Sequence, residues 1–234
     1  MQMLTFNDLL EGLLNIKLSN EQKLQFETYY ETLIAYNKHT NLTTITEPKD
    51  FIIKHLLDSI WILERRSFKN QIQVADIGTG AGFPGIPLKI INPSMKLTLI
   101  DSNGKKIKFL NEVIHKIGIN VEVVYERAEM YAKSHQEKFD VIVSRAVAEL
   151  SELIEIVVPM LKVGGSFYAY KGSDVTEEIL RANHAMKVLH AKKTNIYEHM
   201  LPNNKGKRTI IKVVKNKHIE GYPRTFQQIK KKGL

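Results

Sequence analysis

Cysteine is absent from this chain of 234 residues. Its absence excludes disulfide bonds, thiolate metal sites, iron–sulfur clusters and a cysteine nucleophile. Long apolar runs are missing too, since none reaches the ~18 residues that a membrane-spanning helix needs. The N-terminal residues MQMLTFNDLLEG lack the basic segment and apolar block of a secretory leader. We therefore expect a cytoplasmic protein without a membrane-spanning segment.

Positive charge is concentrated at the C-terminal end of the chain. From Asn203 to Leu234 there are ten Lys or Arg residues and one acid, Glu220, whereas residues 1–202 hold 24 basic and 24 acidic residues. The net charge of +9 therefore lies in the last segment. Such a segment is either a solvated tail or a surface that binds the phosphates of nucleic acid.

Hydrophobic periodicity divides the chain into two parts. Three amphipathic helical patterns precede residue 69, and short apolar strands alternate with helices after Asn70. Such alternation predicts a mostly parallel sheet with helices on both faces. NIYEH and TIIKVVK have no helix between them and predict an antiparallel hairpin at one edge. We predict a helical cap over residues 1–68, a seven-stranded α/β domain over 69–220 and a basic tail over 221–234.

A glycine-rich loop follows the first predicted strand, in VADIGTGAGFPGIPL at residues 74–88. Ligands of open α/β sheets bind at the carboxyl ends of strands, where Gly78 and Gly80 would let the backbone approach them. Gly80 to Gly85 matches G-x-G-x-x-G, but no GK[ST] follows, which excludes a P-loop. Asp101 ends the second strand, where an acid accepts hydrogen bonds from a ribose diol. Both NAD and S-adenosylmethionine (SAM) carry such a diol, so Asp101 does not discriminate between them.

Three features favour SAM. Asp76 lies inside the first strand, where a carboxylate would repel a pyrophosphate but attract an ammonium or sulfonium group. Ala128 and Glu129 follow the third strand, where an adenine edge would lie. The basic segment suits a large anionic substrate. The alternatives are an NAD-dependent oxidoreductase, for which no Tyr-x-x-x-Lys pair is suitably placed, and a non-catalytic RNA-binding protein with a SAM-type fold.

The chain resembles the class I SAM-dependent methyltransferases and, more closely, the bacterial RsmG family, once called glucose-inhibited division protein B. The resemblance rests on NLT at 41–43, HLLDS at 55–59, DIGTGAGFPGIPL at 76–88, LIDSNGKKIKFL at 99–110, ERAE at 126–129, VSRAVAEL at 143–150 and YKG at 170–172. It implies a Rossmann-like seven-stranded methyltransferase sheet with an N-terminal helical extension. It also implies methyl transfer from SAM to N7 of one guanine in small-subunit (16S) ribosomal RNA.

The resemblance also implies site residues. The expected cofactor-binding residues are Gly78, Gly80, Phe83, Asp101, Ala128, Glu129 and Arg145. The partner would be small-subunit ribosomal RNA or the ribosomal subunit, and we expect the protein to be a monomer.

Five further residues are candidates for the substrate side. His55 and Asp58 are spaced i, i+3 and either pack together or line the pocket with Asn41. Lys171 and Arg208, at the ends of two strands, either face RNA or are solvated. The eight histidines show no paired spacing such as HExxH, so we expect no metal.

We assign no catalytic residue as a general base. The fourth strand ends in Ser144-Arg145-Ala146-Val147. It lacks the Asn or Asp, proline pair and aromatic residue that position an exocyclic amine. Guanine N7 carries a lone pair and no proton, so its methylation requires alignment more than a base.

Overall fold

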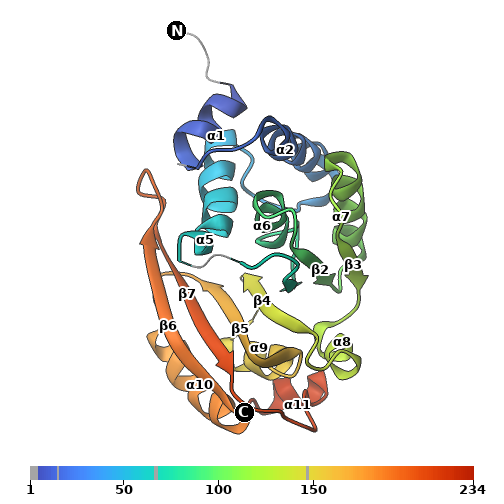
Figure 1. Ribbon diagram of the computed structural model, residues 1–234, viewed down its shortest axis with the longest axis vertical. Helices are drawn as coiled ribbons and strands as arrows, with labels where there is room; N and C mark the ends of the chain where they lie inside the picture. The colour runs from blue at the N-terminus through green and yellow to red at the C-terminus, as the bar shows by residue number, and fades with distance from the viewer. Residues whose placement is uncertain (1–4, 15, 66–67, 146–147) are drawn as a thin grey trace.

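The computed structural model describes residues 5–14, 16–65, 68–145 and 148–234. The N-terminal part is helical, with α1 (Phe6–Leu14), α2 (Asn20–Thr40) and a segmented helix. The segments are α3 (Pro48–Phe51), the π-helical turn η1 (Ile52–Leu57), α4 (Asp58–Ile60) and α5 (Ile62–Arg65). Figure 1 shows these helices in blue and cyan, with α1 and α2 at the top of the view.

A seven-stranded sheet forms the centre of the fold, in the order β3-β2-β1-β4-β5-β7-β6. The first five strands are parallel, and β7 is antiparallel to both β5 and β6. The strands are β1 (Gln73–Ile77), β2 (Lys96–Asp101), β3 (Glu122–Tyr125), β4 (Phe139–Arg145), β5 (Leu161–Lys171), β6 (Ala191–Met200) and β7 (Lys207–Lys215). This order confirms the predicted seven-stranded sheet and its antiparallel hairpin.

The remaining helices cover both faces of the sheet, in α6 (Gly85–Ile91), α7 (Gly104–Ile117), α8 (Ala128–Ser134), α9 (Leu150–Val157), α10 (Thr176–Val188) and α11 (Phe226–Lys231). Side chains alternate along each strand between two cores. Val141 and Val143 join the core that includes α2, α6 and α7, whereas Ile142 joins the core that includes α8, α9 and α10. Because both faces are covered, the parallel strands are almost continuously apolar.

Local sequence explains two helix boundaries that matter for the site. Ser19 and Gln22 form a reciprocal capping box that starts α2. Asn41 ends α2 in the left-handed conformation, with φ 49°, a region that asparagine tolerates better than most residues.

The segment predicted as a basic tail contains structure. Thr225 and Gln228 form a capping box that starts α11, and Ile229 of this helix is buried in the core on the α9 side of the sheet. Figure 1 shows α11, in red, close to α8 and α9. None of the helices in the described ranges combines the length and apolar character needed to cross a bilayer.

Candidate functional site

Two pockets lie at the carboxyl ends of the parallel strands. The first pocket has a volume of about 420 Å³, within the ~300–1,000 Å³ typical of small-molecule sites. It is lined by the ends of β1 and β2, by α8 and α9, and by two residues of α11. The second pocket, of about 360 Å³, is lined by the segmented helix and by residues from β4, β5 and β7. Ala146 and Val147, which follow β4 in the sequence, lie outside the described residues.

The glycine loop forms one wall of the first pocket. Gly78, Gly80 and Gly82 have φ values of 66°, 64° and 98°, which favour glycine because a Cβ is strained there. The amide of Gly78 donates to the carbonyl of Ile100 at 2.8 Å, so the loop is fixed to β2. A Cβ on Gly82 would lie 2.9 Å from the Tyr29 hydroxyl. The glycines therefore permit both the loop conformation and its close packing under α2.

Asp76 is fully buried behind this loop. Its Oδ2 accepts hydrogen bonds from the Thr79 hydroxyl at 2.7 Å and the Gly85 amide at 2.8 Å. Burial raises the pKa of Asp76 to about 7. From the sequence we expected this carboxylate to attract an ammonium or sulfonium group of the ligand. In the structure its hydrogen bonds hold the glycine loop and the first turn of α6 together.

Asp101 connects the glycine loop to the end of β2. Its Oδ2 accepts from the Gly80 amide and its Oδ1 from the Asn103 amide, both at 2.9 Å. The Lys106 ammonium lies 3.7 Å from the same carboxylate. Both Asp101 and Gly78 line the first pocket, and Gly80 is held at its edge by Asp101.

Ala128 and Glu129 line the opposite side of the first pocket. Glu129 is 4% exposed, and its carboxylate pairs with the guanidinium of Arg127. Four predicted cofactor residues thus line this pocket, Gly78, Asp101, Ala128 and Glu129, and the amide of Gly80 donates to one of them, Asp101. The residues present fit SAM, because a glycine wall, an acid at the end of β2 and an apolar surface from α9 surround one cavity.

Phe83 and Arg145 lie at the second pocket rather than in the first. The Phe83 ring stacks on His55, with ring centroids 4.3 Å apart, and the Arg145 guanidinium lies 4.9 Å from the Phe83 centroid. Arg145 itself lines the second pocket with His55 and Asp58. Their assignment to the cofactor stays a prediction, and the geometry places them beside the predicted substrate residues.

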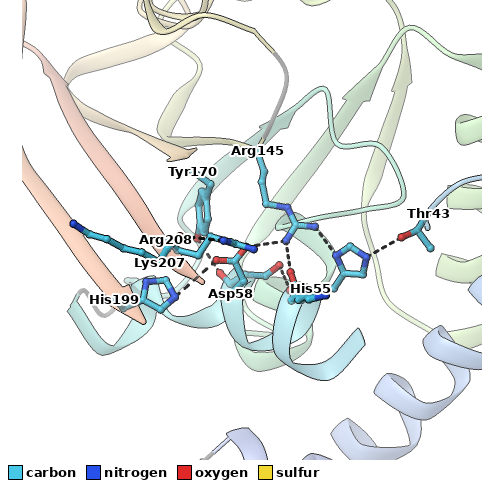
Figure 2. A network of polar contacts seen from close by, with 10 residues as sticks. Thr43, His55, Asp58, Arg145, Tyr170, His199, Lys207 and Arg208 are labelled. Atoms are coloured by element: carbon cyan, nitrogen blue, oxygen red, sulfur yellow. Dashed lines mark hydrogen bonds and ion pairs between the residues drawn. The ribbon is translucent and has the colours of Figure 1, made fainter. Parts of the chain in front are cut away.

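Figure 2 shows the polar network at the second pocket. Arg145 donates to Asp58 Oδ2 at 3.2 Å and contacts His55 Nδ1 at 3.0 Å. Burial, together with the charges of Arg145 and Lys54, lowers the pKa of His55 to about 3. A guanidinium only donates, so Nδ1 is the acceptor and Nε2 carries the proton toward the Thr43 hydroxyl, 3.1 Å away.

Asp58 is the acid at the centre of this network. It is 4% exposed, and burial raises its pKa while Arg145 and Arg208 oppose that rise. Arg208 Nε lies 3.9 Å from Oδ2, and His199 Nε2 lies 3.8 Å from Oδ1. His199 stacks on Trp61, and burial lowers its pKa to about 4. Asp58 therefore holds two arginines from β4 and β7 at the same pocket.

Lys171 and Asn41 have local partners. Lys171 lines the second pocket, and its ammonium contacts the Glu178 carboxylate and the Ala148 carbonyl. Asn41 is exposed, caps the end of α2 and does not line the second pocket. The predicted substrate residues His55, Asp58, Lys171 and Arg208 are therefore brought together, whereas Asn41 is not.

Two residues of the site were missed in the sequence. Thr43, in the NLT motif, contacts Nε2 of His55, and the side chain of Asn37 holds the Thr43 backbone through two hydrogen bonds. The motif was the available signal, but only the fold shows which of its residues faces the pocket. Phe226 lines the first pocket from the C-terminal segment, and no local pattern indicated that position.

Comparison with known proteins agrees with this architecture. A family model described as rRNA small subunit methyltransferase G matches residues 22–210. The ribosomal RNA small subunit methyltransferase G of Acholeplasma laidlawii is 43% identical over 97% of this chain and 99% of its own length. The protein of the same description from Desulforamulus reducens is 44% identical over 88% of each chain.

Solved structures support the fold. A SAM-dependent methyltransferase from Aquifex aeolicus covers 75% of this chain and 97% of its own, with a TM-score of 0.56 and 17% identity. TYW2 of M. jannaschii in complex with AdoMet covers 69% of this chain and 77% of its own, with a TM-score of 0.54 and 18% identity. Together with the extensive sequence identity above, these findings show that the chain belongs to the rRNA small subunit methyltransferase G family.

Proposed function

We propose that this protein transfers a methyl group from SAM to N7 of a guanine in small-subunit (16S) ribosomal RNA. The presence of two pockets at the same edge of the sheet carries the proposal. Arg145 at the end of β4 lines the second pocket, and Ala148, two residues before α9, lines the first. A donor in the first pocket and a base in the second would meet beside these two residues.

The first pocket would hold the donor. Asp101 would accept hydrogen bonds from the ribose hydroxyls, the glycine loop would contact the amino acid portion, and Ala128 with Glu129 would contact the adenine edge. SAM supplies an electrophilic methyl group, and the chain's task is to hold it in a fixed position. The buried Asp76 supports that position by fixing the loop to α6.

The second pocket would hold the RNA. Arg145 and Arg208 present guanidinium groups that suit phosphate, since their planar forks donate two parallel hydrogen bonds. Lys54, from η1, adds a third cation to the lining. A phosphate group entering this pocket would compete with Asp58 for the two arginines.

Every titratable side chain that the structure describes in the lining of the second pocket has a hydrogen-bond or ion-pair partner, although the buried Oδ1 of Asp58 accepts no hydrogen bond. His55 is neutral at pH 7 and contacts both Arg145 and Thr43, Asp58 is paired with Arg145, and Lys171 with Glu178. The Tyr170 hydroxyl donates to the Ser59 carbonyl. This favours an acceptor that has no proton to lose, as guanine N7 does.

The test is methylation of small ribosomal subunits from cells that lack the enzyme, with SAM labelled in its methyl group. The expected product after RNA digestion is labelled 7-methylguanosine from one site. Label on an amine or a ribose, or no incorporation by the folded protein, would contradict the proposal. No incorporation combined with RNA binding would favour the non-catalytic alternative.

We also propose that the enzyme acts as a monomer in the cytoplasm, on ribosomal RNA or on the subunit that contains it. Sedimentation of the purified protein tests the first part. A concentration-dependent dimer would contradict it.

A further inference from the structure

The C-terminal segment contributes a wall to the first pocket. Phe226 and Lys230, both from α11, line that pocket together with Asp101 and Glu129. The sequence suggested only a solvated tail or an RNA-binding surface for this segment. Its position raises the question of whether it serves the cofactor instead.

Buried contacts fix α11 in this position. Arg224, two residues before the helix, donates from Nε and Nη2 to the two carboxylate oxygens of Glu155 on α9, each at 2.7 Å. Glu155 is fully buried and the Arg224 side chain is 25% exposed, so salt screens this bidentate pair less than a fully exposed one. The same Nη2 donates to the Lys232 carbonyl at 3.0 Å, just beyond the other end of α11. One arginine thus connects both ends of the helix to α9.

Side-chain packing reinforces this anchor. Ile229 is 2% exposed and packs in the core beside α9, while Lys230 pairs with Glu152 of α9. Glu152 is itself a lining residue of the first pocket. The segment is therefore docked on α9 rather than extended into solvent.

Phe226 differs from the buried residues of α11. Its side chain is 38% exposed although it lies at the pocket. The guanidinium of Arg127, beside Ala128, lies 4.0 Å from the Phe226 ring centroid. An aromatic ring with an open surface, next to a guanidinium plane, is the kind of surface on which purine bases stack.

We propose that Phe226 is a cofactor-binding residue, and that α11 closes the adenosine half of the SAM site. The proposal rests on the proposed function, because it takes the first pocket as the donor site. It assigns the adenine to the space between Ala128, Glu129 and the Phe226 ring. Arg224 and Lys230 then form ion pairs with Glu155 and Glu152 within the protein rather than with RNA phosphates.

The test compares Phe226→Ala and Phe226→Leu with the wild type, in the full-length chain, by calorimetric titration. The matched control is Gln227→Ala, the next residue of α11, which is exposed and does not line the pocket. Phe226→Ala should weaken binding of SAM and of 5′-methylthioadenosine by the same factor, about tenfold, since loss of base stacking acts on the adenosine portion that both share. Phe226→Leu should weaken both less, and Gln227→Ala should change neither.

Unfolding in urea and RNA binding without SAM complete the test. Neither should change in Phe226→Ala, because the ring is partly exposed and faces the cofactor pocket. Unchanged SAM affinity in Phe226→Ala, with Asp101→Ala still weakening SAM, would overturn this inference alone. If the wild type bound no SAM, the proposed function and this inference would fail together. A loss of RNA affinity without a loss of SAM affinity would assign Phe226 to RNA instead.

Discussion

The two pockets differ in how their polar groups are held. In the first, the polar groups come from a glycine loop and from acids at strand ends, and Asp101 accepts two backbone amides. In the second, charged side chains from η1, α4, β4 and β7 hold one another, with Asp58 between Arg145 and Arg208. Figure 2 shows that this second group is a connected network.

This difference predicts different consequences of mutation. Asp101 of the first pocket is positioned by backbone amides, so its loss should act mainly on donor affinity. Side chains of the second pocket are positioned by each other, so removing one leaves another buried charge without its partner. Changes in the second pocket should therefore affect stability as well as RNA methylation.

The largest expected effect is in the first pocket. Gly78→Val should reduce SAM binding below detection, because a β-branched side chain is strained at φ 66° and would occupy the ligand's space. Gly118→Ala is the control, since it also has positive φ but lies at the end of α7 with open space where a Cβ would lie. Titration with SAM measures the affinity of both variants. Wild-type affinity in Gly78→Val would show that the loop does not belong to the donor site.

The next effect distinguishes the second pocket. Arg145→Ala should lower kcat/KM for RNA methylation by at least ~100-fold and destabilise the fold by roughly 3 kcal/mol, since Asp58 loses its nearest cation. SAM affinity should stay within about threefold, well below the tenfold that ~1.4 kcal/mol would give, if Arg145 serves the RNA. A larger loss would support the cofactor role that the family resemblance implies for this residue. Single-turnover methylation and urea unfolding measure the two effects. Arg145→Lys should recover stability more than activity, because lysine restores the charge without the planar fork.

The contributions of Asp76, behind the first pocket, and His55, in the second, to the stability of the fold should change in opposite directions with pH. Asp76 has a pKa of about 7 when folded against 3.8 as the ordinary value, so its contribution to stability falls as pH rises from about 4 to 7. His55 has a pKa of about 3 against 6.5, so its contribution rises as pH rises from about 3 to 6.5. Each group changes the free energy of unfolding by up to ~1.4 kcal/mol per pH unit within its range.

Two variants isolate these slopes. Relative to the wild type, Asp76→Asn should gain free energy of unfolding as pH rises from about 4.5 to 6.5, and His55→Asn should lose it over the same range. Asparagine keeps an oxygen acceptor at either position, which limits other disturbance. Urea unfolding across this range measures both differences. Parallel pH profiles for the three proteins would contradict the pKa directions.

The smallest effect concerns exposed cations of the C-terminal segment. Lys231 and Lys232 are exposed and do not line the first pocket. The double change to alanine should leave SAM affinity unaltered and lower the log–log salt dependence of RNA binding by up to ~0.7 for each phosphate that these lysines neutralise in the wild type. An unchanged salt dependence would show that these two lysines are only solvated.

The sequence predicted the first pocket better than the second for a physical reason. The glycine loop, Asp101 and Ala128-Glu129 follow directly after strands of a parallel sheet, so the fold class alone brings them to one edge. The parallel order, the antiparallel hairpin and the start of α2 near Ser19 likewise follow from local patterns.

The second pocket depends on contacts that no local pattern contains. The π-helical turn that carries His55 occurs inside what the sequence presents as one continuous helix. Phe83 belongs to the glycine-loop motif but stacks on His55. The position of α11 depends on Arg224 meeting Glu155, 69 residues away in sequence. Such tertiary partners, rather than propensity, decide these features.

The most direct test of separate donor and RNA pockets is to measure SAM binding and RNA binding independently on Asp101→Ala and Arg208→Ala. We expect Asp101→Ala to weaken SAM binding by about 10- to 150-fold, the loss of a hydrogen bond to a charged group, and to leave RNA binding unchanged. Arg208→Ala should weaken RNA binding and reduce its salt dependence while SAM affinity stays at the wild-type value. The assignment of donor and RNA to separate pockets would be wrong if both variants lost affinity for the same ligand. It would also be wrong if Asp101→Ala lost affinity for RNA while Arg208→Ala lost affinity for SAM.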